Sequence, residues 1–194
     1  MPTGFSKLPH VKQELDSIRN EFEGNSHILP EEQFTIDKVR RELLRRTYSI
    51  VHFATHGSFE NNAKDSFLLT YNDRLKMDEL KQLIGIREFS TQPLELLTLS
   101  ACQTAKGDDQ AALGLAGVAI QAGARSALAS LWSVSDAAIA ELMTAFYRHL
   151  KNPKFSKAQA LQEAQLELLK NSKKNSKWEH PNFWAAFLLI GNWL

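Results

Sequence analysis

Two patterns of apolar residues alternate along the chain. Near its start, four apolar side chains recur at helical spacing: Val11, Leu15, Ile18 and Phe22. Further along, nearly continuous apolar runs are typical of buried strands: residues 48–54, 94–100 and 126–131. Strands that alternate with helices predict a three-layer α/β/α sandwich around a mostly parallel sheet.

Residues that cap helices indicate where three further helices begin. Thr35 and Ser135 each precede a segment with helical spacing, and Ser156 with Gln159 forms a capping box. Residues 59–71 with the turn signal Asn72-Asp73 predict a hairpin-like insertion. Residues 106–121 predict a helix that is buried against the sheet, and residues 184–190 a terminal strand.

Composition limits the class of protein. The chain has 194 residues, which suits one domain spanning 1–194, and its formal net charge is +1. The single cysteine excludes an internal disulfide and favours a reducing compartment. We find no signal-peptide core and no apolar run of membrane-spanning length, so we expect a cytoplasmic protein without membrane contacts.

His56 and Cys102 carry the candidate chemistry. Each follows an apolar run, and sites in α/β sheets form beyond the carboxyl ends of parallel strands. A thiol beside an imidazole is the minimum equipment for a cysteine nucleophile with a general base. The alternative is a buried cysteine that packs as a small hydrophobic residue. If the strand continues, His52 shares the face of His56, and we expect it to be a hydrogen-bonded core residue.

The residues around this pair suggest further roles. The amide of Gly57, with that of Cys102, is a candidate oxyanion hole, although Gly57 also suits a plain turn. Trp132 is adjacent to the expected crevice. Asp136 begins a helix, where a carboxylate complements the dipole or holds a cationic substrate group. We expect no metal, because no ligand-spaced cluster accompanies the histidines, and no other cofactor.

Charge patterns identify no nucleic-acid partner. Residues 148–177 hold an excess of basic side chains, which is more typical of a solvated surface than of a nucleic-acid site. The glycine pair Gly114 and Gly117 lies in the apolar helix and lacks the lysine of a phosphate-binding loop.

Several ordered motifs resemble the CHAT domain, the caspase-like domain often found with tetratricopeptide repeats in bacteria. They are His52-Phe-Ala-Thr-His-Gly57, Leu99-Ser-Ala-Cys-Gln-Thr104, Gly114-Leu-Ala116, Ala122-Gly-Ala-Arg-Ser126, Ser130-Leu-Trp-Ser-Val134 and His180-Pro-Asn-Phe-Trp-Ala-Ala186. The resemblance runs from about Leu8 to Leu194. It implies a caspase-like fold and a cysteine endopeptidase used in bacterial regulation or defence, with His56 and Cys102 as its catalytic dyad.

The resemblance also implies partners and a substrate pocket. The segment from Ser130 to Asp136 is similar to the separase segment that supplies an acidic residue to an arginine pocket. Asp136, with Ser133 and Trp132, is therefore expected to bind a basic residue of a protein or peptide substrate. A sensor region or a tetratricopeptide-repeat protein is the expected regulatory partner.

Two alternatives remain at this point. One is a non-catalytic signalling or scaffold domain that keeps the fold and binds protein partners. The other concerns the start of the chain: caspase-like folds usually have a strand before the first helix, whereas this chain begins with a short extension. We therefore expect a single CHAT domain that lacks this first strand or a larger N-terminal region.

Overall fold

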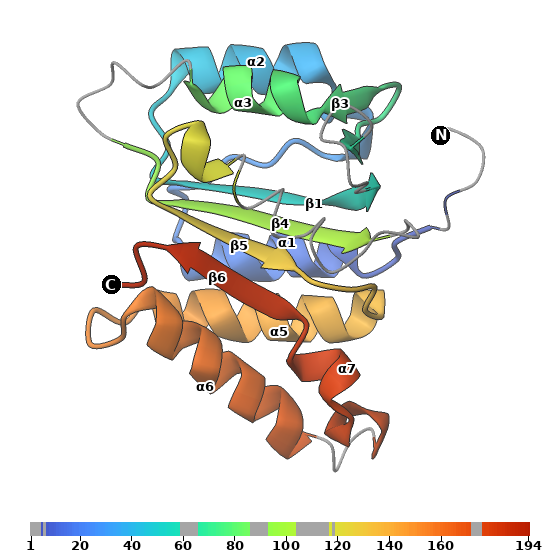
Figure 1. Cartoon of the computed structure of the whole chain (residues 1–194), viewed down its shortest axis with the longest axis vertical. Helices are drawn as coiled ribbons and strands as arrows, with labels where there is room; N and C mark the ends of the chain where they lie inside the picture. The colour runs from blue at the N-terminus through green and yellow to red at the C-terminus, as the bar shows by residue number, and fades with distance from the viewer. Residues whose placement is uncertain are drawn as a thin grey trace.

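A six-stranded sheet divides the molecule into layers (Figure 1). The computed structural model describes residues 5, 7–58, 66–85, 93–103, 117, 119–171 and 176–194, with only the backbone at residues 101–103 and 176. The strand order is β3-β2-β1-β4-β5-β6. The strands are β1 (Ile50–Ser58), β2 (Phe67–Leu69), β3 (Arg74–Lys76), β4 (Leu96–Gln103), β5 (Ser126–Ser130) and β6 (Phe187–Gly191).

The centre of the sheet is parallel and its flanks are antiparallel. β1 pairs in parallel with β4, and β4 with β5. The β2–β3 hairpin and β6 add antiparallel strands at the two sides. This arrangement confirms the expected α/β/α sandwich with a parallel-centred sheet, and it confirms the hairpin.

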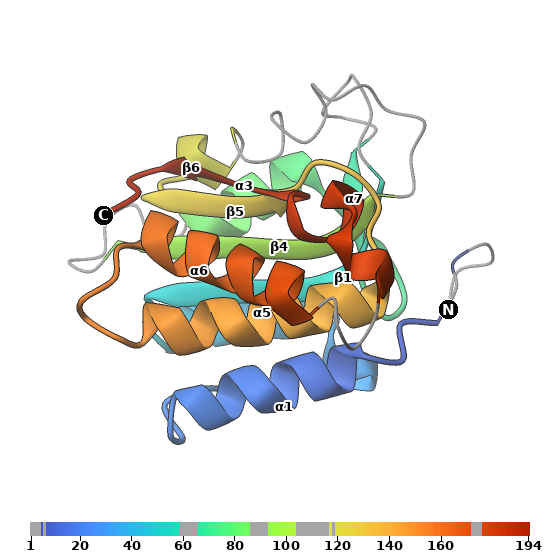
Figure 2. The same ribbon diagram turned by 90° about the horizontal axis from the view of Figure 1, so that it is seen from below.

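Helices cover both faces of the sheet (Figures 1 and 2). One face carries α2 (Ile36–Arg45) and α3 (Met77–Gly85). The other carries α1 (Val11–Glu21), α5 (Asp136–Leu150) and α6 (Lys157–Lys170). Short helical segments complete the described chain: η1 (Glu31–Gln33), η3 (Ser176–Glu179) and α7 (Pro181–Trp184). No helix within the described ranges is both long enough and apolar enough to cross a bilayer.

Each face of the sheet has its own apolar core. On the α2/α3 face, Val39 and Leu43 of α2 meet Leu80 and Leu83 of α3 over the sheet. The second core contains buried residues of α5 and α6, which include Leu142, Phe146, Leu161, Ala164 and Leu168. Because both faces are buried, the central strands read as continuous apolar runs rather than as alternating ones.

The capping residues lie where the sequence predicts them. The Thr35 hydroxyl accepts the Lys38 amide of α2, and the Ser135 hydroxyl accepts the Ala138 amide of α5. Ser156 and Gln159 form both bonds of a capping box at the start of α6. A side-chain cap of this kind contributes about 1 kcal/mol by satisfying amides that have no partner within the helix.

Three boundaries differ from the sequence prediction. β1 continues through His56 and Gly57, and β4 continues through Cys102, so these residues lie within strands rather than after them. Gly57 and Ser58 stay extended because they pair with Leu68 and Phe67 of the hairpin. The terminal strand begins only at Phe187, since Pro181–Trp184 form α7. Of the predicted helix at 106–121, residues 117 and 119–121 alone are described, and they are helical.

Candidate functional site

The register of the sheet brings the two candidate catalytic residues side by side. His56 of β1 lies opposite Cys102 of β4, in the parallel pairing that also aligns His52 with Thr98. Neighbouring strands are about 4.8 Å apart, and side chains of every second residue share a face. Since His52 reaches residues of α1 and α5, the side chain of His56 also lies on the α1/α5 face. The side chain of Cys102 is outside the described part.

His56 is enclosed rather than open to solvent. Its exposed fraction is 6%. The ring of Phe5, which precedes α1, lies with its centroid 5.1 Å from that of the His56 imidazole, at an interplanar angle of 39°. The chain ahead of α1 therefore passes beside the carboxyl ends of β1 and β4 (Figure 1).

A buried set of polar side chains lies on the same face of the sheet, beside the positions of β1 and β4 that precede His56 and Cys102. This set, the Glu14 network, consists of Glu14, His52, Thr98, Ser100 and Tyr147. Glu14 Oε1 accepts hydrogen bonds from His52 Nε2 at 2.9 Å and from Ser100 Oγ at 2.8 Å. His52 Nδ1 lies 3.0 Å from the Tyr147 hydroxyl, which donates to Thr98 Oγ1 at 2.8 Å.

The Glu14 network is buried in the interior of the molecule. Glu14 and Tyr147 are 0% exposed, and the side chain of His52 is 8% exposed. Burial raises the pKa of the Tyr147 phenol, and the nearby Glu14 carboxylate acts in the same direction, against the hydrogen bond to Thr98. These contacts tie α1 and α5 to the two strands that hold the candidate dyad.

The sequence reasoning anticipated one member of the network and missed another. His52 is a hydrogen-bonded core residue, as expected. Glu14 was not singled out, although a signal was present. It lies three residues after Val11 and four before Ile18, so a carboxylate interrupts the apolar stripe of α1. A charge in that position requires a buried partner.

The residues after β5 have contacts of their own. Asp136 is the first residue of α5, and its Oδ2 accepts the backbone amide of His10 at 2.6 Å. The Trp132 indole donates to the Asn182 carbonyl at 2.9 Å, and the Ser133 side chain is exposed. All three residues lie at the carboxyl-end side of the sheet. Gly57 is buried within β1. Its role as an amide donor in an oxyanion hole stays a prediction.

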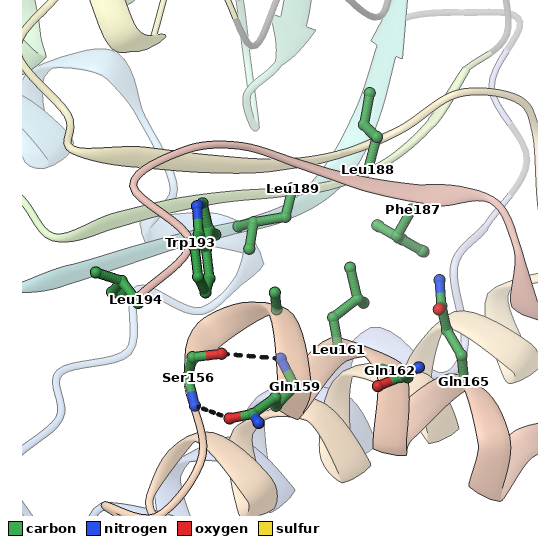
Figure 3. A pocket seen from close by; sticks show the side chains of 11 residues that line it. Ser156, Gln159, Leu161, Gln162, Gln165, Phe187, Leu188, Leu189, Trp193 and Leu194 are labelled. Carbon is green, nitrogen blue, oxygen red and sulfur yellow. Dashed lines mark hydrogen bonds between the residues drawn. The ribbon is translucent and has the colours of Figure 1, made fainter.

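A groove lies elsewhere on the molecule, between β6 and α6 (Figure 3). Its volume is about 750 Å³, and its lining includes Leu161, Gln165, Phe187 and Trp193. None of the candidate site residues lines this groove. Within the described part of the chain, no group of three or more histidine, cysteine, aspartate or glutamate side chains has the geometry to hold a metal ion.

Comparison with known proteins identifies the class. Residues 1–192 match the CHAT domain family, so the chain belongs to this caspase-like family. The chain is also similar to tetratricopeptide repeat protein 28 of Homo sapiens, with 36% identity over 102 residues. That match covers 52% of this chain and 4% of the human protein, so the chain spans a small part of that relative's length.

Proposed function

We propose that this chain is a cysteine endopeptidase with Cys102 as its nucleophile and His56 as its general base. The observation that carries the proposal is the register that sets His56 against Cys102 at the carboxyl ends of two parallel strands. Membership of a caspase-like family supports it. The thiolate adds to the scissile carbonyl, and the imidazolium then protonates the leaving amine. Water releases the acyl group from sulfur and restores the thiol.

Neighbouring groups complete the proposed site. The amides of Gly57 and Cys102 stabilise the oxyanion of the tetrahedral intermediate. The Asp136 carboxylate binds a basic side chain of the substrate, in a pocket bordered by Ser133 and Trp132. The substrate is a protein or peptide, cleaved after lysine or arginine in the cytoplasm of a bacterium. The similarity to a tetratricopeptide repeat protein supports a partner of that kind as the regulator.

A non-catalytic scaffold domain is the competing function, and one observation favours it. His56 is 6% exposed and lies against the ring of Phe5, which is unusual for a base that must reach a substrate. In such a domain the dyad position would be a packed part of the core, and protein partners would bind elsewhere on the surface.

The test is cleavage of fluorogenic peptides that end in lysine or arginine. We expect turnover by the purified chain and none by Cys102→Ala, with peptides ending in aspartate as the specificity control. Ser66→Ala is a matched control, since it removes one polar atom from a buried residue outside the dyad. Equal turnover by the wild type and Cys102→Ala would overturn the peptidase, and so would no turnover together with no labelling by a peptidyl acyloxymethyl ketone.

A further inference from the structure

The segment ahead of α1 contacts the candidate site at both of its ends. We call Phe5 with residues 7–10 the N-terminal strap. At one end, the Phe5 ring packs on the imidazole of His56. At the other, the His10 amide donates to Asp136 Oδ2 at 2.6 Å, over a separation of 126 residues. The two contacts therefore involve the proposed general base and the proposed specificity residue.

Topology places Cys102 between these two contacts. His56 lies near the end of β1, Cys102 lies near the end of the adjacent β4, and Asp136 follows β5, which is next in the sheet. Two strand spacings amount to roughly 10 Å. Residues 9 and 10 form a turn ahead of α1, and the three residue steps from Phe5 to Leu8 span at most about 10 Å. The strap is thus long enough to run past the end of β4 between its two anchors.

The contacts of the strap satisfy the groups that a substrate would use. The Asp136 carboxylate, which is proposed to bind a cationic side chain, accepts a main-chain amide of the chain itself. An amide bonded to a carboxylate is a charge-assisted hydrogen bond and is stronger than a neutral one. The Phe5 ring lies against the imidazole that must approach the thiol and the leaving amine.

The helix behind the strap is held by contacts of its own. Glu14 docks α1 through His52 and Ser100, and Glu23, two residues past the end of the helix, pairs with Lys151 at 3.2 Å. Lys7, within the strap, is exposed. Within the strap, Leu8 is partly buried against the core that contains residues of α5 and α6. Release of the strap therefore also removes the packing of Leu8, whereas the buried contacts of α1 lie beyond the strap in the sequence and can persist.

We propose that the N-terminal strap is an intramolecular inhibitor that occupies the substrate path between His56 and Asp136. This inference rests on the proposed peptidase function, whose site it regulates. Substrate binding requires the strap to be displaced, so a partner that holds the strap away raises activity. The population of the open form sets the apparent affinity for substrate, and each contact of the strap lowers that population.

The test is the alkylation rate of Cys102 by iodoacetamide, a reagent that needs neither Asp136 nor peptide cleavage. Because the chain has one cysteine, the label is unambiguous. Phe5→Ala removes one anchor and Asp136→Asn weakens the other, and we expect each to raise the rate about fivefold, as the loss of one aromatic or charge-assisted contact predicts. Lys7→Ala is the matched control within the strap, with an expected rate equal to that of the wild type.

The outcomes separate the strap from the peptidase. Equal rates in the wild type, Phe5→Ala and Asp136→Asn would overturn the strap, and so would an equal rise in Lys7→Ala. Hydrogen exchange at the amides of α1 checks whether the variants stay folded. Faster alkylation with unchanged exchange in α1 supports the inhibitory strap. Faster alkylation together with loss of protection in α1 overturns the inhibitory strap. Faster labelling without any peptide cleavage retains the strap and overturns the peptidase.

Discussion

Glu14 Oε1 accepts a hydrogen bond from His52 Nε2, with 2.9 Å between the two atoms. Neither side chain has more than 8% of its surface exposed. A carboxylate only accepts hydrogen bonds, so Nε2 of His52 carries a proton and donates it in this bond. The bond joins α1 to β1, the strand that carries His56. It gives the molecule a polar connection across an otherwise apolar layer.

Removal of this carboxylate is expected to destabilise the fold strongly. Glu14→Ala leaves His52 and Ser100 without their acceptor, and loss of one partner of a buried pair costs about 3–5 kcal/mol. Asp16→Ala on the same helix breaks an exposed pair with Lys12, for which about 0.5 kcal/mol is expected. Urea denaturation of both variants measures the difference, and similar midpoints would contradict a stabilising role for the Glu14 network.

The phenol of Tyr147 provides a second probe of the same network. Tyr147→Phe keeps the ring but removes the hydroxyl that lies between His52 and Thr98, and we expect a loss of about 1–3 kcal/mol because Thr98 is fully buried. Tyr71→Phe, at a residue with an exposed fraction of 41%, is the control and should change stability little.

Alkaline titration tests the environment of that phenol. Burial raises the pKa of Tyr147 above its ordinary value of 10.0, so the folded protein holds the phenol proton more tightly than the unfolded chain. The resulting stability is complete below the ordinary pKa and is lost as pH rises above it. Between pH 9 and 11, the midpoint temperature of thermal unfolding should therefore fall more steeply for the wild type than for Tyr147→Phe. Parallel curves of midpoint against pH would contradict this expectation.

The contact between α5 and α6 is expected to respond to acid. Partial burial alone would raise the pKa of Glu167, but hydrogen bonds from His149 and Arg148 outweigh it and lower the pKa. A carboxyl whose pKa is lowered by folding stabilises the protein at pH values above its ordinary pKa. That stability is lost as the pH falls through the pKa of the folded state. Glu167→Gln should flatten the stability profile below pH 5, whereas the partly buried control Glu163→Gln on the same helix should not.

The proposed general base predicts a specific loss of activity. His56→Asn keeps a polar side chain of similar size but cannot transfer the proton, so we expect kcat to fall by about two orders of magnitude or more. His27→Asn, far from the strand ends in sequence and partly exposed, is the matched control. Peptide turnover and iodoacetamide labelling measured together show whether the imidazole acts on the thiol. Unchanged turnover in His56→Asn would contradict its role.

Local signals were sufficient for most of the elements. The caps at Thr35, Ser135 and Ser156 mark helix starts because unpaired amides at a helix terminus need a nearby acceptor. The apolar runs identified three central strands because a parallel sheet covered on both faces has no solvent side. The six ordered motifs between His52 and Ala186, taken together, were enough to identify the family.

Tertiary structure decided which residues from distant parts of the sequence lie next to one another. The strand ends at His56 and Cys102 look like loops in the sequence because they are polar, and pairing with their neighbours keeps them extended. The partners of Glu14 lie 38 and 86 residues away, and that of Asp136 lies 126 residues away. Sequence determined where most of the helices and strands form, because those preferences are local. The register that aligns the dyad and the contacts of the strap arise only when distant segments pack together.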